Sequence, residues 1–433
     1  MNRTHSCFAD WIQGTHLSLY LASRTFRNLQ TGDEERIDVP MRAIAGGYYK
    51  NVMDMYDHLG VRYQAQPLLF SFSKLSSKAE KGDHVREEPY FVHASNHHRT
   101  PPIRPAGTGL LKYVLRTLYL IVCYAWLSIC FFTVKSRSDN GSSFFFVQYL
   151  QRIWLPEHFV RFYVLPLFAS VATCTHEQLL DFPASDLIDY KKRSHGAQHC
   201  IVKDGIRSVQ EKLAAGLNIR LSSKVTSVEP QSSGVVVRWS VVDGFEPASA
   251  IRKDHFDKVV LAIAPDAVAR LFEPLKSRLS RIPTTSVTSV SHRPVDWSPS
   301  TGSNDHVISL RTCESADVRT EAAHLHPSGV VVTTDPLSPI DSDTVLQKSR
   351  FTRVLRTPES RQVLQQIFRE NVRNSSHLME KPGWTNGDQS VWLAGGWCWD
   401  GMVLLEGCVV SAMWVAQDLG VEVPWRGRSN TLR

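Results

Sequence analysis

The chain lacks the features that mark several protein classes. None of its eight cysteines lies in a Cys-x-x-Cys pair, the spacing typical of structural zinc sites and redox motifs, so we expect no metal site and no disulfide framework. The N-terminal sequence MNRTHSCFADWIQGTH contains no apolar stretch, so we expect no signal peptide there. Both absences favour a reducing compartment.

The chain also has little excess charge. Its 49 basic and 42 acidic residues give a net charge of +7, and the densest basic cluster is only Lys191-Lys192-Arg193. This distribution indicates a solvated surface and argues against a nucleic-acid partner. With 42% hydrophobic residues in 433, the composition is that of a packed protein and excludes a disordered or fibrous chain.

One long apolar segment interrupts this soluble pattern. Thr117 to Val134 are eighteen consecutive uncharged, mostly apolar residues, with Lys112 and Arg116 before them and Lys135 and Arg137 after them. This length reaches the ~17–25 residues that a membrane-spanning helix needs. The segment therefore predicts a spanning helix, a helix buried between domains, or a helix lying in a membrane interface. Localisation accordingly stays membrane-associated or cytoplasmic.

Short apolar strands and amphipathic helices alternate along the rest of the chain. The pattern predicts a helix after Gly46-Gly47, helices over about 148–171, and a helix at Val209–Leu213. Strands are predicted at Ile219–Leu221, Val225–Glu229, Val235–Val242, Lys258–Ile263, Val287–Ser291, Val307–Leu310 and Gly329–Thr334, and a helix near Arg361–Arg369. Residues 74–108 are polar and contain prolines, and we expect a loop there. The alternation predicts an α/β protein.

The most informative segment is Val391 to Gly420. An apolar strand leads into Gly395-Gly396, a tryptophan-rich loop follows, and a long helix over 402–419 closes the segment. Glycines at a strand end let backbone approach a ligand closely, and a helix N-terminus offers free N–H groups. The segment favours a ligand site at the strand ends, although close packing of a strand on a helix would select the same small residues.

Four segments together resemble the FAD-dependent amine-oxidase-like flavoproteins, including fungal predicted FAD/NAD(P)-binding oxidoreductases. They are VWLAGGWCWDGMVLLEGCVVSA, VKDGIRSVQEKLAAGLNIRLSSKVTSV, FDKVVLAIAPDAV and IDVPMRAIAGGYYKNVMDMYDHLGV. The resemblance implies FAD as cofactor, bound near Val225, Ala264, Gly395, Gly396, Leu405 and Glu406.

The chain departs from this family at its beginning. The family opens with a strand, a Gly-x-Gly-x-x-Gly turn and a helix that hold the FAD pyrophosphate, whereas the run Gly107-Thr108-Gly109 follows a proline-rich loop. The start MNRTHS resembles the end of the family's first helix, as though roughly forty residues of such a unit preceded it. Trp397 stands at the position where the family has an acidic residue.

The resemblance implies a Rossmann-like FAD-binding domain, N-terminally incomplete, interleaved with an α+β substrate domain. Its expected parts are FAD-binding residues 1–73, a helical substrate or cap region 74–198 with the apolar helix 117–134, FAD-binding residues 199–275, substrate-domain strands 276–390, and a C-terminal FAD-contacting strand and helix 391–433.

The resemblance implies hydride transfer from a hydrophobic small molecule to flavin, with molecular oxygen as acceptor, and we expect a place in specialised metabolism. Trp397, Trp399 and Tyr48 are expected to bind the substrate, and no catalytic base is identified; His176 and His292 are the imidazoles to test first. The alternatives are a monooxygenase of the same fold, a cofactor-free remnant, and a single-pass membrane scaffold.

Overall fold

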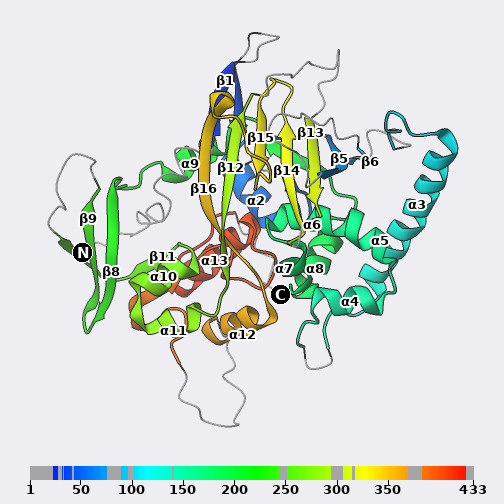
Figure 1. The fold of residues 1–433 in the computed structure, drawn as a ribbon. Helices are drawn as coiled ribbons and strands as arrows, with labels where there is room; N and C mark the ends of the chain where they lie inside the picture. The colour runs from blue at the N-terminus through cyan, green and yellow to red at the C-terminus, as the bar shows by residue number, and fades with distance from the viewer. Residues whose placement is uncertain are drawn as a thin grey trace.

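The computed structural model describes residues 23–27, 32, 34–40, 43–75, 89–95, 102–138, 141–242, 251–293, 306–314, 317–368 and 383–425. A large mixed sheet with helices on one side stands beside a small parallel strand pair with its own helices (Figure 1). A long helix lies at one extremity and a three-stranded sheet at the other.

The large sheet has seven strands and is antiparallel except between β13 and β5, where Ile308 lies opposite Phe70 in parallel register. Residues along β13 alternate between buried and half-buried, as expected for a strand with one face on the core. In spatial order the strands are β16 (Val345–Val354), β12 (Thr284–His292), β15 (Val331–Thr334), β14 (Arg319–Leu325), β13 (His306–Cys313), β5 (Leu68–Leu75) and β6 (Phe91–Ala94).

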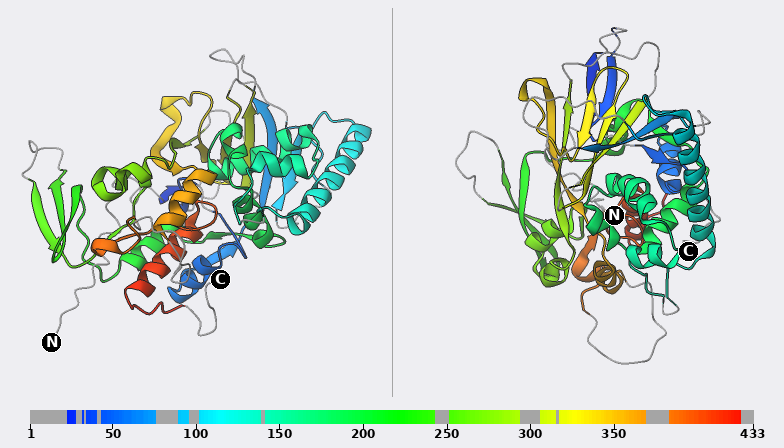
Figure 2. Two further views of the ribbon diagram at one scale, coloured as in Figure 1. Left: turned by 90° about the horizontal axis from the view of Figure 1, so that it is seen from below. Right: turned by 45° about the vertical axis from the view of Figure 1, so that its right-hand side comes forward.

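A helical layer packs on this sheet through α6, which contacts β13 and β14. Pro166 lies in the first turn of α6, where a missing N–H is tolerated, and Thr175 caps α7 by accepting a hydrogen bond from Gln178 N. The layer comprises α3 (Leu110–Thr133), α4 (Phe146–Arg152), α5 (Glu157–Phe159), the π-helical turn η3 (Val160–Val164), α6 (Leu165–Ala172), α7 (His176–Leu180) and α8 (Ala184–Ser194). Figure 2 shows α3 running along the outside of this layer.

The parallel pair consists of β11 (Val259–Leu261) and β17 (Val391–Leu393). Among the described residues, β11 is the only strand that pairs with β17. The helices near this pair are α10 (Pro265–Leu271), α11 (Lys276–Leu279), α12 (Pro358–Ile367) and α13 (Leu405–Asp418), with 3₁₀ turns at Glu273–Leu275 and Asp388–Ser390.

Smaller elements complete the fold. An antiparallel sheet of β8 (Ser223–Gln231), β9 (Gly234–Val241) and β10 (Arg252–Phe256) projects at the left of Figure 1. The rest are the hairpin β1 (Ser23–Arg27) and β2 (Glu34–Asp38), the sheet β3 (Ile44–Ala45), β7 (His199–Val202) and β4 (Tyr63–Ala65), the 3₁₀ turn Ser342–Thr344, and helices α2 (Lys50–His58) and α9 (Gly205–Ala214).

Two large apolar cores organise these elements. The first joins the helical layer to β5, β13, α2, α9 and α13, and includes Tyr48 and Trp399. The second joins β8, β9, β11 and β17 to α10 and α12, and includes Trp397. The loop between β17 and α13 therefore enters both cores.

Several sequence-based expectations are wrong in detail. Ile219–Leu221 forms no strand, because this extended stretch finds no partner before β8 begins at Ser223. Residues 74–108 contain the end of β5 and all of β6 besides loop. The apolar run 117–134 begins inside a longer helix, and the final helix starts at Leu405 and not at Met402.

Candidate active site at the strand ends

The carboxyl ends of β11 and β17 lie side by side. Leu261 pairs with Leu393, and Ala394 N donates a hydrogen bond to Leu261 O at 3.2 Å, so the parallel register continues to the strand ends. Ala264 is the N-cap residue of α10 and follows the end of β11 by three residues, and Gly395 follows the end of β17 by two. Such an edge is where open α/β sheets bind ligands.

The two glycines allow the end of β17 to lie directly against α13. Gly395 has φ +149, and a Cβ there would come 3.2 Å from Trp397 Nε1. A Cβ on Gly396 would come 2.9 Å from Leu404 O. Gly395 N donates to Ser411 Oγ of α13 at 2.9 Å. The positive φ and the nearby Trp397 ring account for Gly395, close approach to the start of α13 accounts for Gly396, and the Gly395 amide is already paired.

The start of α13 carries no side-chain cap. Leu404 precedes the helix in extended conformation, and the carboxylate of Glu406 turns to α2 instead. There it accepts hydrogen bonds from Asn51 N at 3.0 Å, Asn51 Nδ2 at 2.6 Å and Val52 N at 3.1 Å. Burial raises the pKa of Glu406, and these hydrogen bonds oppose that rise. Glu406 was expected to bind the cofactor, but its side chain binds α2 instead. Only its backbone remains at the first turn of α13.

Trp397 and Trp399 point into different cores. The Trp397 indole donates from Nε1 to Ile263 O at 2.9 Å, so it spans the two strand ends. The Trp399 indole donates to Met402 O at 2.9 Å and lies on Gly407, where a Cβ would come 2.2 Å from Nε1. Trp397 and Trp399, both expected to bind the substrate, therefore do not line one common surface.

Trp399 instead joins an aromatic cluster with Tyr48 and Tyr190. The Tyr48 ring meets the Tyr190 ring edge-on at 4.7 Å and the Trp399 ring at 5.9 Å. Tyr48 is 1% exposed, and its hydroxyl has no hydrogen-bond partner among the described residues. An unpaired buried hydroxyl costs about 1–3 kcal/mol. A ligand or water that accepts from Tyr48 would remove this cost.

Burial also holds the Tyr48 hydroxyl in its protonated form. Desolvation raises the pKa of Tyr48 well above 10.0, and the neighbouring Tyr49 and Asp186 raise it further. At neutral pH the group is therefore a hydrogen-bond donor.

A buried ionic cluster binds the loop between β17 and α13 (residues 394–404), which we call the tryptophan loop. Arg356 Nη2 donates to Trp399 O at 2.9 Å and to Gly401 O at 3.0 Å. Arg361 Nη1 donates to Asp186 Oδ1 at 2.6 Å, and Arg361 also pairs with Asp400. The pattern of the sequence did not reveal this cluster, because its members come from α8, α12 and the loop and share no local motif.

Val225 borders the same core as the strand ends. It lies in β8, and its side chain packs, as do those of Ile263 and Trp397, in the core that contains Val259 and Leu393. The segments around Val225, Ala264 and Gly395 therefore converge on one region of the molecule. That convergence is what a bound dinucleotide would require.

The two candidate imidazoles lie elsewhere: His292 ends β12 of the large sheet, and His176 begins α7 and contacts β14. His176 Nε2 lies 2.8 Å from Thr320 Oγ1, and His292 Nε2 lies 3.0 Å from Thr333 Oγ1. Burial lowers the pKa of both, that of His176 to about 4. Both are held by threonines in their neutral form, and neither is identified as a base. Across the described ranges, no group of three or more His, Cys, Asp or Glu side chains is arranged to hold a metal ion.

Comparisons with known proteins find one matching family and two similar folds. Residues 157–334 match the family of flavin containing amine oxidoreductases. No curated protein sequence matches the chain. Among solved structures, the chain resembles cyclohexylamine oxidase from Brevibacterium oxydans IH-35A, with a TM-score of 0.53, 11% identity, and coverage of 92% of this chain and 91% of that one.

It also resembles a fatty acid isomerase from P. acnes that produces CLA, with a TM-score of 0.52, 10% identity, and coverage of 94% and 91%. At these identities the likeness shows the fold. The expected α/β fold of FAD-binding amine-oxidase type is confirmed.

The described strand ends suit the flavin end of FAD better than its phosphates. The first turn of α13 has no side-chain cap, so the backbone N–H groups of Leu405 and Glu406 could donate hydrogen bonds to a carbonyl oxygen of the flavin ring. The Gly395 amide is already bonded to Ser411, so the phosphates would need other donors. Leu405 and Glu406 are therefore the residues whose backbone would hold the ring. The match of residues 157–334 to flavin containing amine oxidoreductases and the shared fold support an FAD-dependent amine-oxidase-like flavoprotein, and the matched family implies FAD as cofactor.

Proposed function

We propose that this flavin oxidoreductase oxidises a hydrophobic small molecule that binds against Tyr48, Tyr190 and Trp399, with molecular oxygen as electron acceptor. The observation that carries the proposal is the buried, unpaired Tyr48 hydroxyl inside an aromatic cluster that touches the start of α13. When bound, FAD supplies the acceptor for a hydride from the substrate carbon and the route for those electrons to oxygen.

The residues of this chain supply binding and orientation. The buried aromatic rings form an apolar environment that excludes water from an apolar substrate. The Tyr48 hydroxyl, protonated because its pKa is raised, donates a hydrogen bond to one polar atom of that substrate and so fixes its orientation. Arg356 fixes the loop that carries Trp399, through its two bonds to loop carbonyls.

The two structural neighbours guide the choice of substrates to test. One is a cyclohexylamine oxidase and the other a fatty acid isomerase, and cyclohexylamine and fatty acids are largely apolar molecules. A monooxygenase would share every contact described here, and only the product distinguishes the two reactions. A place in specialised metabolism is proposed on the family resemblance alone.

One observation favours a second candidate, a cofactor-free binding protein. The chain's own Trp397 and Ser411 occupy the positions beside Gly395 that a dinucleotide would approach. Such a protein would use the aromatic cluster to bind an apolar molecule without oxidising it.

An absorbance spectrum after reconstitution with FAD separates the candidates. We expect retained flavin with a band near ~450 nm, bleached anaerobically by an apolar amine or fatty acid and restored by air. Peroxide release identifies an oxidase, and an oxygenated product identifies a monooxygenase. Tyr48→Phe should keep the flavin band and weaken substrate bleaching roughly tenfold, the effect of about 1.4 kcal/mol. Tyr63→Phe, a partly exposed tyrosine on β4, is the control. Colourless protein would contradict the proposal.

A further inference from the structure

The outer face of α3 is apolar along its whole length. Large apolar side chains at one-turn intervals are exposed there, and several are more than half exposed. They are Leu111 at 73%, Leu115 at 58%, Leu118 at 55%, Val122 at 67%, Ile129 at 54% and Phe132 at 54%. We call these six residues the α3 stripe. A soluble monomer rarely leaves a contiguous apolar patch of this size in water.

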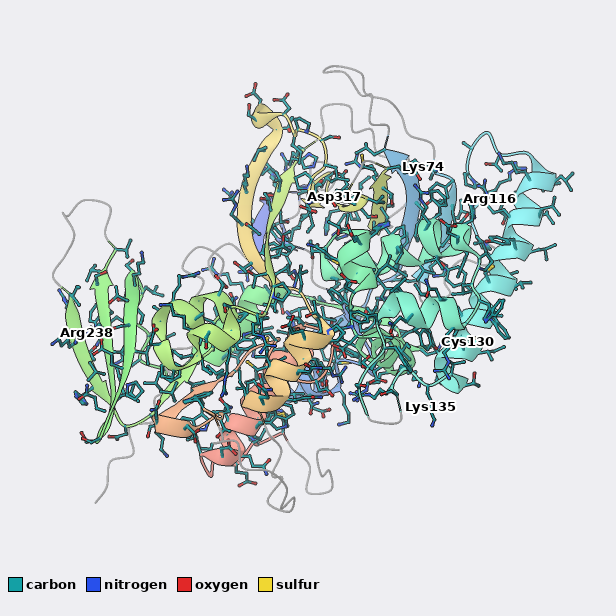
Figure 3. The ribbon with its side chains drawn as sticks, turned by 60° about the horizontal axis from the view of Figure 1, so that its bottom comes forward. Lys74, Arg116, Cys130, Lys135, Arg238 and Asp317 are labelled. Atoms are coloured by element: carbon teal, nitrogen blue, oxygen red, sulfur yellow. The ribbon has the colours of Figure 1, made fainter. Side chains whose placement is uncertain are left out.

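The opposite face of α3 belongs to the protein core. Leu120, Cys123, Leu127, Cys130 and Phe131 are buried in the first core. The Trp126 indole donates to Ile153 O at 2.7 Å, and the Tyr149 hydroxyl donates to Cys130 O at 2.8 Å. Figure 3 shows Arg116 and Cys130 on α3 beside the rest of the helical layer. By length and composition α3 could cross a membrane, but crossing would require removing this face from the core.

The charges carried by α3 and its flanking residues are of one sign. Residues 102–138 contain the basic residues Arg104, Lys112, Arg116, Lys135 and Arg137 and no acidic residue; of these, Arg137 is paired with Asp400 and lies 4.0 Å from Asp189 of α8. The Phe132 ring meets His195 at 5.4 Å, so the basic end of α8, with Lys191, Lys192 and Arg193, lies next to the end of α3. Trp154, 88% exposed, follows directly after the residue that Trp126 contacts. Tryptophan and basic residues around an apolar surface are typical of a membrane interface.

A second copy of the chain suits this surface less well. Two stripes packed face to face would bring the basic residues of both copies together, with no acidic side chain from 102–138 to pair with them. An anionic bilayer offers both an apolar interior and phosphate groups.

From the exposed stripe, the buried opposite face and the basic ends, we infer that α3 is an in-plane membrane anchor. The stripe inserts into the boundary between headgroups and acyl chains, and the basic residues meet lipid phosphates. Because α8 packs on α3 and carries Tyr190 of the aromatic cluster, the anchor places that cluster next to a layer of apolar molecules. The inference stands independently of the proposed function.

Vesicle flotation with the full chain tests the anchor. We expect binding to phosphatidylcholine vesicles that contain phosphatidylserine, and weaker binding to phosphatidylcholine alone or in high salt. Leu118→Glu and Val122→Glu should each lower the partition coefficient at least tenfold, since each loses the burial of a large apolar side chain. Leu213→Glu, an exposed leucine of α9 at 46%, is the matched control and should bind as the wild type does.

Lysine labelling of the vesicle-bound protein tests the in-plane orientation. A membrane-impermeant reagent added outside sealed vesicles should modify both Lys112 and Lys135, which lie at the two ends of α3 and are exposed. Protection of one end only would show a spanning helix and overturn the inference. Absence of binding to both vesicle types, equal loss in the Leu213→Glu control, or a dimer in solution that Val122→Glu dissociates would overturn it too.

Discussion

Individual residues at the candidate site make contacts that differ from the cofactor and substrate contacts expected from the sequence. Glu406 holds α2, Trp397 spans the ends of β11 and β17, and only Trp399 and Tyr48 meet in the aromatic cluster. Their residue types are visible in the sequence, but their directions depend on which core each side chain enters. A glycine pair and two tryptophans predict a site at this loop without saying which side chain faces it.

His176 makes folding stability depend on pH. Its folded pKa is about 4, below the ordinary 6.5, because burial disfavours the charged ring. A lowered histidine pKa gives stability that is present above 6.5 and is lost as the pH falls toward 4, since the unfolded chain then binds the extra proton. We expect the wild type to lose about 1–2 kcal/mol more stability than His176→Gln between pH 7 and pH 5.

Urea denaturation of both proteins at the two pH values measures this difference. Other buried histidines, such as His324, contribute equally to both proteins and cancel in the comparison. An identical pH dependence in the variant would show that His176 is not the group responsible.

At the scale of elements, the contact between the tryptophan loop and α13 depends on a glycine, which has no side chain. A Cβ on Gly407 would come 2.2 Å from Trp399 Nε1 and 2.8 Å from Gly396 O, and the second atom is backbone. The loop can therefore lie on the helix only if position 407 is glycine. In a helix a glycine is otherwise unfavourable by about 1 kcal/mol relative to alanine.

Gly407→Ala should lower the free energy of unfolding by roughly 1–3 kcal/mol, the usual range for overpacking. The matched control is Gly109→Ala at the start of α3, where a Cβ meets nothing within 4 Å. Thermal unfolding measures both, and tryptophan fluorescence should shift only in Gly407→Ala, because Trp399 has to move. A Gly407→Ala protein as stable as the wild type would mean that the loop does not rest on α13.

Apolar strands and helices could be predicted from the sequence, and polar ones could not. β11, β17 and α13 are buried on several sides, so their sequences are apolar runs ended by glycine or proline. β14 reads RTEAAHL and β16 reads VLQKSRFTRV, and neither was predicted, because polar side chains along them resemble a loop. β14 is a strand because it pairs with β15, and β16 because it pairs with β12. Such long-range pairing leaves no local signal in the sequence.

At the scale of the whole molecule, buried charges hold the layers together. Asp186 of α8 pairs with Arg361 of α12, and Arg356 beside it binds the tryptophan loop. Burial raises the pKa of Asp186, and both arginines lower it. Since Asp186 and Arg361 are 175 residues apart and Arg356 and Trp399 are 43 apart in the sequence, no local motif could have predicted their meeting.

Asp186→Ala should lower the free energy of unfolding by about 3–5 kcal/mol, because it leaves buried guanidinium groups without their carboxylate. Asp189→Ala on the same helix is the control; its partly exposed carboxylate lies 4.0 Å from Arg137, and we expect a change below about 1 kcal/mol. Urea unfolding followed by circular dichroism measures both. Equal effects would show that the buried cluster adds nothing to the stability of the assembled layers.

The division of Trp397 and Trp399 between two cores couples these cores mechanically. Only Cys398 lies between Trp397 and Trp399, so the backbone that joins the two residues can extend very little. A shift of the helical layer that carried Trp399 with it would pull on Trp397 and, through its bond to Ile263 O, on the end of β11. Events on the outer side of the protein can in this way reach the strand ends through three consecutive residues.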